Sequence, residues 1–408
     1  PPIGDRTDTR RRDGSGRDGA SRDGGRSETG RPDIRNPDFR RSDADRRERR
    51  DGPRGLDAVK DSRSESTEAG GRRTIIRESD NRVIVRENNR VFIQSNRNRR
   101  FERFSRDART RSLGDGTRLS VVNRPGGITI HSVTDRDGRL VRRFRRDRDG
   151  REITILDNRR RDRFGRPIAI GLGLGIGALI ARSIIDVPPP RIRMPREKYI
   201  VEYDRASDED LYEALSAPPL DRLERAYTLD EVLVSRGLRD RMRRIDHSSI
   251  NFAFGAWEVD EAQVGKLERI ARAMLRVIDR NPAEMFLVEG HTDAVGSDVD
   301  NLTLSDRRAE AVAEILTEEF GVPPENLATQ GYGEQFLKVE TDEPERLNRR
   351  VAFLRLTPLL AQRDDRDERS DRYPRDDRDQ PEPRDDRDDR DPRDDQDTRE
   401  QRDDRDNR

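Results

Sequence analysis

Apolar residues recur at helix and strand spacing between residues 250 and 358. From Val264 to Ile278 they follow the i, i+3, i+4, i+7 rule, which predicts a helix with one buried stripe. A second helix is expected to open at Ser305 and to end near Gly321. Strands are expected at four apolar runs, residues 250–254, 285–289, 327–331 and 351–354. This alternation predicts the α/β class, as an α+β sandwich whose mixed sheet carries helices on one side.

A different texture occupies residues 72–158, where short β-branched runs alternate with polar pairs. The runs are Thr74–Ile76, Val83–Val85, Val91–Ile93, Ile128–Ile130 and Ile153–Ile155. The pairs suited to tight turns are Asp80-Asn81, Asn88-Asn89, Asp137-Gly138 and Asp149-Gly150. Strands separated by such turns predict an antiparallel β-hairpin meander.

One strongly apolar, glycine-rich segment lies at residues 167–187, with its core from Ile168 to Ala181. The core is shorter than the roughly 20 apolar residues that span a bilayer. Its regularly spaced glycines would let two helices approach closely in lipid. Two interpretations stay open: membrane association through residues 168–181, or a buried segment of a soluble fold. Residues 188–249 form a proline-containing helical connector, in which Thr228 is expected to cap a helix together with Glu231.

Composition separates these regions from the two ends of the chain. Charged residues make up 42% of the 408 residues and the hydrophobic set only 30%. Residues 1–71 and 363–408 combine arginine and aspartate with very few aliphatic side chains, so both are expected to be long disordered tails. The 85 basic and 85 acidic residues cancel. The mixed charges are typical of polyampholytes and argue against a nucleic-acid partner.

Polar motifs follow the predicted strands and helices of the C-terminal region in a fixed order. They are Gly290-His291-Thr292-Asp293, Gly296-Ser297, Asn301-Leu302-Thr303-Leu304-Ser305 with Arg308-Ala309, Gly331-Tyr332-Gly333-Glu334, and Asn348-Arg349-Arg350-Val351. Their order and spacing resemble the peptidoglycan-binding domain of the OmpA-like, Pal-like and MotB-like family. The resemblance covers about a quarter of the chain, residues 250–358.

The resemblance implies noncovalent capture of the diaminopimelate of uncrosslinked stem peptides. In that family an aspartate and an arginine clamp the free amino acid end, and these match Asp293 and Arg308. A zwitterion needs one anion for its ammonium and one forked cation for its carboxylate, which arginine supplies bidentately. Because Arg308 is expected in the first turn of its helix, free backbone amides would support the carboxylate as well.

Four further positions belong to the site that the resemblance implies. Asn301 matches a loop residue that helps to line the site, and Arg349 matches an arginine near the bound peptide. Thr292 and Leu304 are expected to shape the pocket walls. Two departures from the family pattern put secondary contacts in doubt: Asp300 precedes Asn301 where an aromatic residue is common, and Gly255-Ala256-Trp257 follows the first strand where an acidic residue is common.

The implied function is non-catalytic: peptidoglycan binding that tethers an envelope component to the cell wall, at the outer membrane or facing the periplasm. The alternative hypothesis is an envelope scaffold or assembly protein that self-associates into homo-oligomers through its β-rich region, with the OmpA-like domain only an anchor. No cofactor is implied. His291 and Asp293 could suggest a metal or acid-base site, but no second histidine lies nearby in the sequence. We interpret His291 as a structural hydrogen bonder at a strand end.

Overall fold

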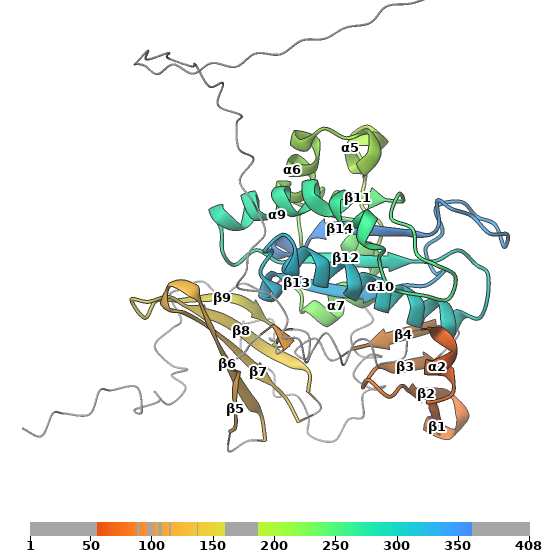
Figure 1. Ribbon diagram of the computed structural model, residues 1–408, viewed down its shortest axis with the longest axis horizontal. Helices are drawn as coiled ribbons and strands as arrows, with labels where there is room; N and C mark the ends of the chain where they lie inside the picture. Colours follow the sequence, from red (N-terminus) through yellow and green to blue (C-terminus); the bar gives the residue numbers. More distant parts are fainter. Residues whose placement is uncertain are drawn as a thin grey trace, which may run out of the picture. The chain divides into compact units, whose positions relative to one another are not determined.

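The computed structural model describes residues 55–87, 90–95, 101, 103–104, 108–113, 116–136, 138–159 and 187–360. Residues 1–54, the tail from residue 361 and the apolar run 168–181 therefore lie outside the described residues. Within the described ranges, no helix combines the length and the apolar character that crossing a membrane requires. These ranges contain one four-stranded and two five-stranded sheets (Figure 1).

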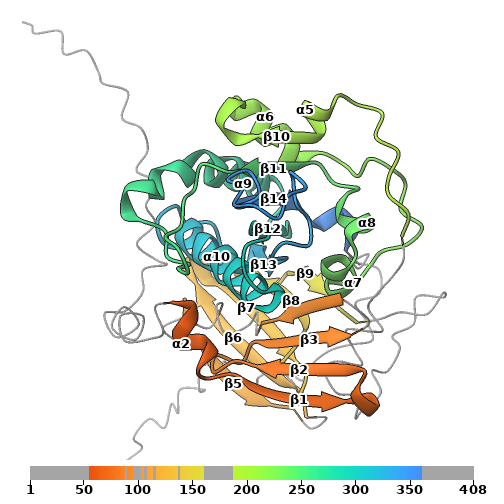
Figure 2. The ribbon, with the colours of Figure 1, turned by 90° about the vertical axis from the view of Figure 1, so that its right-hand side faces the viewer.

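The four-stranded sheet is an antiparallel meander with its strands in sequence order (Figure 2). Its elements are helix α2 (Leu56–Lys60), β1 (Ser64–Glu68), the 3-10 turn η2 (Ala69–Gly71), β2 (Arg73–Arg77), β3 (Val83–Glu87) and β4 (Arg90–Gln94). At the turn between β2 and β3, Asn81 has a φ of 65°, and the amide of Glu78 donates to the carbonyl of Arg82. The meander begins earlier than expected, because residues 55–71 already form a helix and a strand.

The second sheet is also an antiparallel meander in sequence order. Its elements are β5 (Arg109–Ser112), β6 (Arg118–Arg124), η3 (Pro125–Gly127), β7 (Ile128–Thr134), β8 (Leu140–Arg146) and β9 (Glu152–Asp157). Gly138 and Gly150 turn the chain at φ values of 79° and 81°. The predicted meander is therefore confirmed, although three of these strands, β5, β6 and β8, had not been expected.

The third sheet is mixed, in the order β10-β11-β14-β12-β13. Its strands are β10 (Ile200–Glu202), β11 (Arg244–His247), β12 (Phe286–His291), β13 (Leu327–Gly331) and β14 (Arg350–Arg355). The prediction of a strand at residues 250–254 is wrong. The chain turns back at Gly255, with a φ of 66°, so that Phe252 forms only an isolated bridge with Val259. Its place beside β14 is taken by β11, from the segment expected to be only a helical connector.

Helices and 3-10 turns complete this region. They are α5 (Arg196–Tyr199), η4 (Tyr203–Arg205), α6 (Asp208–Ser216), α7 (Leu229–Val234), α8 (Arg236–Arg239), η5 (Glu261–Leu267), α9 (Glu268–Arg280), α10 (Asp298–Glu318), η6 (Pro324–Asn326) and η7 (Thr357–Leu359). The predicted capping box of Thr228 and Glu231 is confirmed at the start of α7. The predicted start of α10 at Ser305 is wrong: the helix begins at Asp298, capped by the Ser297 hydroxyl.

Both faces of the mixed sheet are covered by apolar side chains. On one face, α6, α9 and α10 pack on residues that include Phe286 and Phe353, so the expected fold class holds for the C-terminal region (Figure 1). On the other face, Leu287 and Leu354 share a cluster with residues of α7, α8 and the second meander, among them Ile130. The meander that precedes the mixed sheet is thus packed into the same hydrophobic core.

Candidate functional site

Two glycines bring α10 directly onto the sheet. A Cβ atom on Gly290 would lie 1.9 Å from the carbonyl oxygen of Ser305, and one on Gly331 would lie 2.3 Å from the amide nitrogen of Asp306. The same helix residues hold the loop after β13, because the Gly331 amide donates to Asp306 Oδ1 at 3.0 Å and the Gly333 amide donates to Ser305 Oγ at 2.8 Å. These contacts place the loops that follow β12 and β13 beside the middle of α10.

The loop after β12 carries the first residue of the predicted clamp. Asp293 is buried, and its Oδ2 accepts a hydrogen bond from Nη1 of Arg349 at 2.6 Å. The side chain of Arg349 keeps 43% of its surface exposed. The amide of neighbouring Thr292 donates to the carbonyl of Gly333 at 3.0 Å, which ties the two loops together. The carboxylate of Asp293 is thus held in place and paired with a partly exposed guanidinium.

Asn301 links the same loops from the second turn of α10. Its Nδ2 donates to the carbonyl of Asp293 at 3.3 Å, to the carbonyl of Val295 at 3.1 Å and to Oε2 of Glu334 at 2.5 Å. Asn301 therefore holds the backbone of the loop that carries Asp293. Glu334 was missed as a contributing residue, although it belongs to the Gly331-Tyr332-Gly333-Glu334 motif that was found in the sequence.

Arg308 lies in the middle of α10, so its expected place in the first turn is wrong. Backbone amides at the helix start therefore give no support to an anion bound there. Its Nε donates to the carbonyl of Ala256 at 3.0 Å, Nη2 reaches the carbonyl of Ala253 at 3.5 Å, and its Cζ lies 4.7 Å from the ring centroid of Phe252. The turn at 252–256 thus forms a wall against the guanidinium.

The charge of Arg308 has no carboxylate in contact among the described residues. Burial lowers the pKa of Arg308 to about 10; the charge of Asp293 opposes this shift, and the charge of Arg349 adds to it. The structure therefore brings Asp293, Thr292, Asn301 and Arg349 into one contact network. Arg308 lies within the electrostatic reach of this network, and Leu304 is a buried residue of the helix that carries both Asn301 and Arg308.

His291 lies at the end of β12 in a separate, buried ionic cluster. Its ring stacks on Tyr332, with 5.8 Å between the centroids, and its Nε2 lies 3.5 Å from Glu289. Burial and the charge of Arg350 lower the pKa of His291 to about 4. Burial opposes ionisation of Glu289, but His291 and Arg239 lower its pKa to about 2. His291 is therefore neutral near pH 7, and Glu289 pairs with Arg239 at 2.8 Å.

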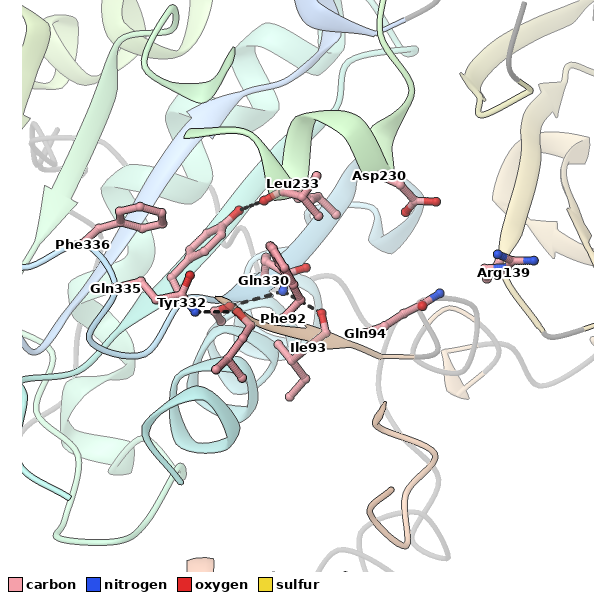
Figure 3. A pocket seen from close by; sticks show the side chains of 13 residues that line it. Phe92, Ile93, Gln94, Arg139, Asp230, Leu233, Gln330, Tyr332, Gln335 and Phe336 are labelled. Carbon is pink, nitrogen blue, oxygen red and sulfur yellow. Dashed lines mark hydrogen bonds between the residues drawn. The ribbon is translucent and has the colours of Figure 1, made fainter. Parts of the chain in front are cut away.

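A cavity of about 50 Å³ lies on the other side of the loop after β13. Figure 3 shows it between β4, α7 and this loop, with Tyr332 Oη donating to the carbonyl of Leu233 and Gln330 donating to the carbonyl of Ile93. None of the six predicted site residues lines it. Its volume suits a few water molecules and falls well below the roughly 300 Å³ of a small ligand pocket.

Comparison with known proteins identifies the domain around this site. The family model of the OmpA family matches residues 251–350. Residues 251–350 form an OmpA family domain. This match contains all six predicted site residues and the two glycines on which α10 packs.

Known relatives match about a quarter of the chain. Outer membrane porin F of Pseudomonas aeruginosa is 36% identical over 104 residues, which are 25% of this chain and 29% of that protein. The peptidoglycan-associated lipoprotein of Haemophilus influenzae is 33% identical over 89 residues, 22% of this chain and 55% of that protein. The chain thus spans less than a third of the first relative and about half of the second. A crystal structure of the peptidoglycan-associated lipoprotein from Burkholderia pseudomallei aligns at 24% identity and a TM-score of 0.23, covering 26% of this chain and 87% of that one.

The ranges that the structure describes contain no group of three or more histidine, aspartate or glutamate side chains placed to hold a metal ion. Around Asp293 and Arg308 the side chains offer opposite charges. An anion and a cation lie near each other on separate elements, each held by backbone contacts. Such an arrangement is suited to binding a zwitterion.

Proposed function

We propose that the OmpA family domain binds peptidoglycan noncovalently, through the free amino acid end of diaminopimelate in stem peptides. Arg308 is the observation that carries this proposal. It is a buried cation without a contacting carboxylate in the described chain, and burial lowers its pKa to about 10. A buried charge that lacks a counter-ion gains much from an arriving anion. The carboxylate of diaminopimelate supplies that anion.

Asp293 provides the second half of the proposed clamp. The ligand ammonium would share or replace the contact that Arg349 makes with Asp293 Oδ2. Arg349 can give way to the ligand, because 43% of its side-chain surface already faces solvent. Asn301 and Thr292 would hold the loop in place, and Leu304 would keep the helix packed beneath it.

The wider role that we propose is a non-catalytic tether between an envelope component and the cell wall. The relatives are named as an outer membrane porin and as peptidoglycan-associated lipoproteins. We accordingly place the chain in the envelope, at the outer membrane or facing the periplasm. The domain boundaries expected from the sequence, with residues 250–358 as the wall-binding part, belong to this proposal.

Sedimentation of the chain with purified peptidoglycan sacculi tests the clamp. Asp293→Asn and Arg308→Met should each weaken binding by about 30-fold or more, because removing one charge strands the other, at a cost of roughly 2–5 kcal/mol. Arg276→Met is the matched control, since this arginine of α9 is 47% exposed and contacts Glu209 and the ring of Tyr212, away from the clamp residues. Retention of wild-type binding by both clamp variants, with native circular dichroism, would overturn the assignment.

A further inference from the structure

Helix α10 is held on a second side by the first meander. Arg63 reaches it from the start of β1, donating through Nη1 to Asp300 Oδ1 at 2.7 Å and through Nη2 to Thr303 Oγ1 at 3.0 Å. From the end of β2, Glu78 accepts from Thr303 Oγ1 at 2.7 Å and from Arg307 Nη2 at 3.2 Å. The helix and the meander are thus joined by charged side chains of both signs.

The turn between β2 and β3 adds a deeply buried pair. Arg82 Nε lies 2.8 Å from Asp306 Oδ2, and the same guanidinium also pairs with Asp80 and Glu310. Burial alone would lower the pKa of Arg82, but these three carboxylates raise it well above its ordinary value. Arg307 makes the reverse pairing: here the cation lies on α10, and its Nη2 is 2.8 Å from Oδ2 of Asp80 in the turn.

An apolar seam accompanies the ion pairs. Ile76, Ile84 and Ile93 of the meander pack with Val299 and Leu302 of α10 in one buried cluster. The charges on this face of α10 would be solvated if the OmpA family domain stood alone. Burying them requires partners of opposite sign, and the first meander supplies each one. This complementarity makes the docking specific.

The docked meander touches both structures that surround Arg308. On the helix, Asp300 and Arg307 each directly precede a predicted site residue, Asn301 and Arg308. On the facing turn, the amide of Leu56 at the start of α2 donates to the carbonyl of Gly255 at 3.0 Å. That turn is the one whose carbonyls at 253 and 256 accept from Arg308.

We propose that the unit formed by α2 and β1–β4, residues 55–94, is a positioning element of the wall-binding site. It clamps the 252–256 turn and α10 together, and thereby fixes the direction of the Arg308 guanidinium. Release of the unit weakens ligand binding without removing any residue that touches the ligand. This inference rests on the proposed function. It adds that residues outside the OmpA family domain influence how tightly the ligand is bound.

The single tryptophan of the chain makes the inference measurable. Trp257 follows the 252–256 turn, and its ring centroid lies 4.7 Å from Cζ of Arg307. A change in docking should therefore alter the emission of Trp257. The experiment measures both this emission and the affinity of the full chain for a soluble muropeptide that carries diaminopimelate.

The decisive variant is Arg82→Met, with Glu78→Gln as a milder change at the same interface. Each should shift the emission of Trp257 and weaken muropeptide binding by about 2- to 30-fold. Arg86→Ala is the matched control, because the pair of Arg86 with Asp298 belongs to the same interface but is 45% and 43% exposed. It should leave both readouts unchanged.

Altered Trp257 emission with unchanged affinity in both interface variants would overturn the positioning role. If Arg82→Met does not fold, the Glu78→Gln result decides alone. A substitution in the clamp should give a different result from one at the interface. Asp293→Asn should remove binding and leave the emission of Trp257 unchanged. A wild-type chain that binds no muropeptide would reject the proposed function and this inference with it.

Discussion

Three buried histidines predict that the protein loses stability in mild acid. His131, His247 and His291 are the only histidines of the chain. Burial is the largest cause that lowers each pKa from its ordinary value of 6.5 to about 4. Nearby positive charges add to this, from Arg146 at His131 and from Arg350 at His291.

The sign follows from proton counting. Between pH 6.5 and about 4 the three histidines bind protons in the unfolded chain but not in the folded chain. The free energy of unfolding therefore falls as the pH falls. The full stability is present above pH 6.5. Each such histidine contributes a slope of at most about 1.4 kcal/mol per pH unit. Three together should therefore lower the free energy of unfolding by roughly 3 kcal/mol between pH 6 and pH 5.

Urea unfolding followed by circular dichroism at a series of pH values measures this slope. The informative variant is His131→Phe, because the ring stacks on Phe144 with 4.7 Å between centroids and phenylalanine preserves that contact. Its stability at pH 7 changes by the loss of the bond to Thr129 Oγ1, whereas its pH slope should fall by about a third. A slope equal to that of the wild-type chain would refute the assignment of a buried, neutral His131.

Three further changes address particular contacts. Arg239→Met should cost about 3–5 kcal/mol in urea unfolding, because Glu289 would remain ionised and buried; a loss below 1 kcal/mol would contradict the ion pair. Gly290→Ala should prevent native folding or lower the free energy of unfolding by more than about 4 kcal/mol, since its Cβ would lie 1.9 Å from the carbonyl oxygen of Ser305. A melting temperature equal to that of the wild-type chain would disprove this close packing. Asn158→Ala removes the acceptor of an amide at the start of α7 and should cost about 1–3 kcal/mol. Unchanged protease resistance would argue against this link between the second meander and α7.

The residues proposed as the clamp could be singled out in the sequence because each lies in a motif with strong local chemistry. Gly290 and Gly331 mark the places where α10 approaches the sheet too closely for a Cβ atom, and the polar residues that follow them form the site loops. Asn301 and Glu334 likewise lie within recognisable motifs. Local spacing carries this information because the sheet register brings Gly290 and Gly331 side by side.

The arginine-rich strand β8 was missed because arginine occupied positions that face the interior. In β8, Arg142 and Arg143 are 3% and 2% exposed, so the usual alternation of apolar and polar residues is absent. Their guanidinium groups lie over the rings of Phe144 and Phe101 at 4.7 Å and 4.5 Å. Arg143 Nε also donates to Ser132 Oγ. Contacts of this kind between arginine and aromatic or polar side chains cannot be inferred from hydrophobic periodicity.

The start of α10 was misplaced for a related reason. Its first two turns contain Asp298, Asp300 and Asn301, residue types that favour caps and turns over helix interiors. The helix extends through them because Ser297 caps it and because the meander binds Asp300 through Arg63. The contact of Arg63 with Asp300 joins residues 237 positions apart, which no local pattern reveals.

The same packing changes how the alternative hypothesis of a self-associating β-rich scaffold should be tested. The apolar face of the second meander is already packed against the mixed sheet, where Ile130 shares a cluster with Leu287 and Leu354. The edge strands β1 and β5 present polar side chains, which disfavour pairing with another sheet. Deleting residues 1–190 would therefore expose Leu287 and Leu354 to water, so we expect the truncated chain to aggregate whichever hypothesis holds. Monomeric behaviour of that truncation in sedimentation velocity would show that the shared core is dispensable. Substitutions at the buried ion pairs on α10 leave this core intact, and so they can separate wall binding from assembly where the deletion cannot.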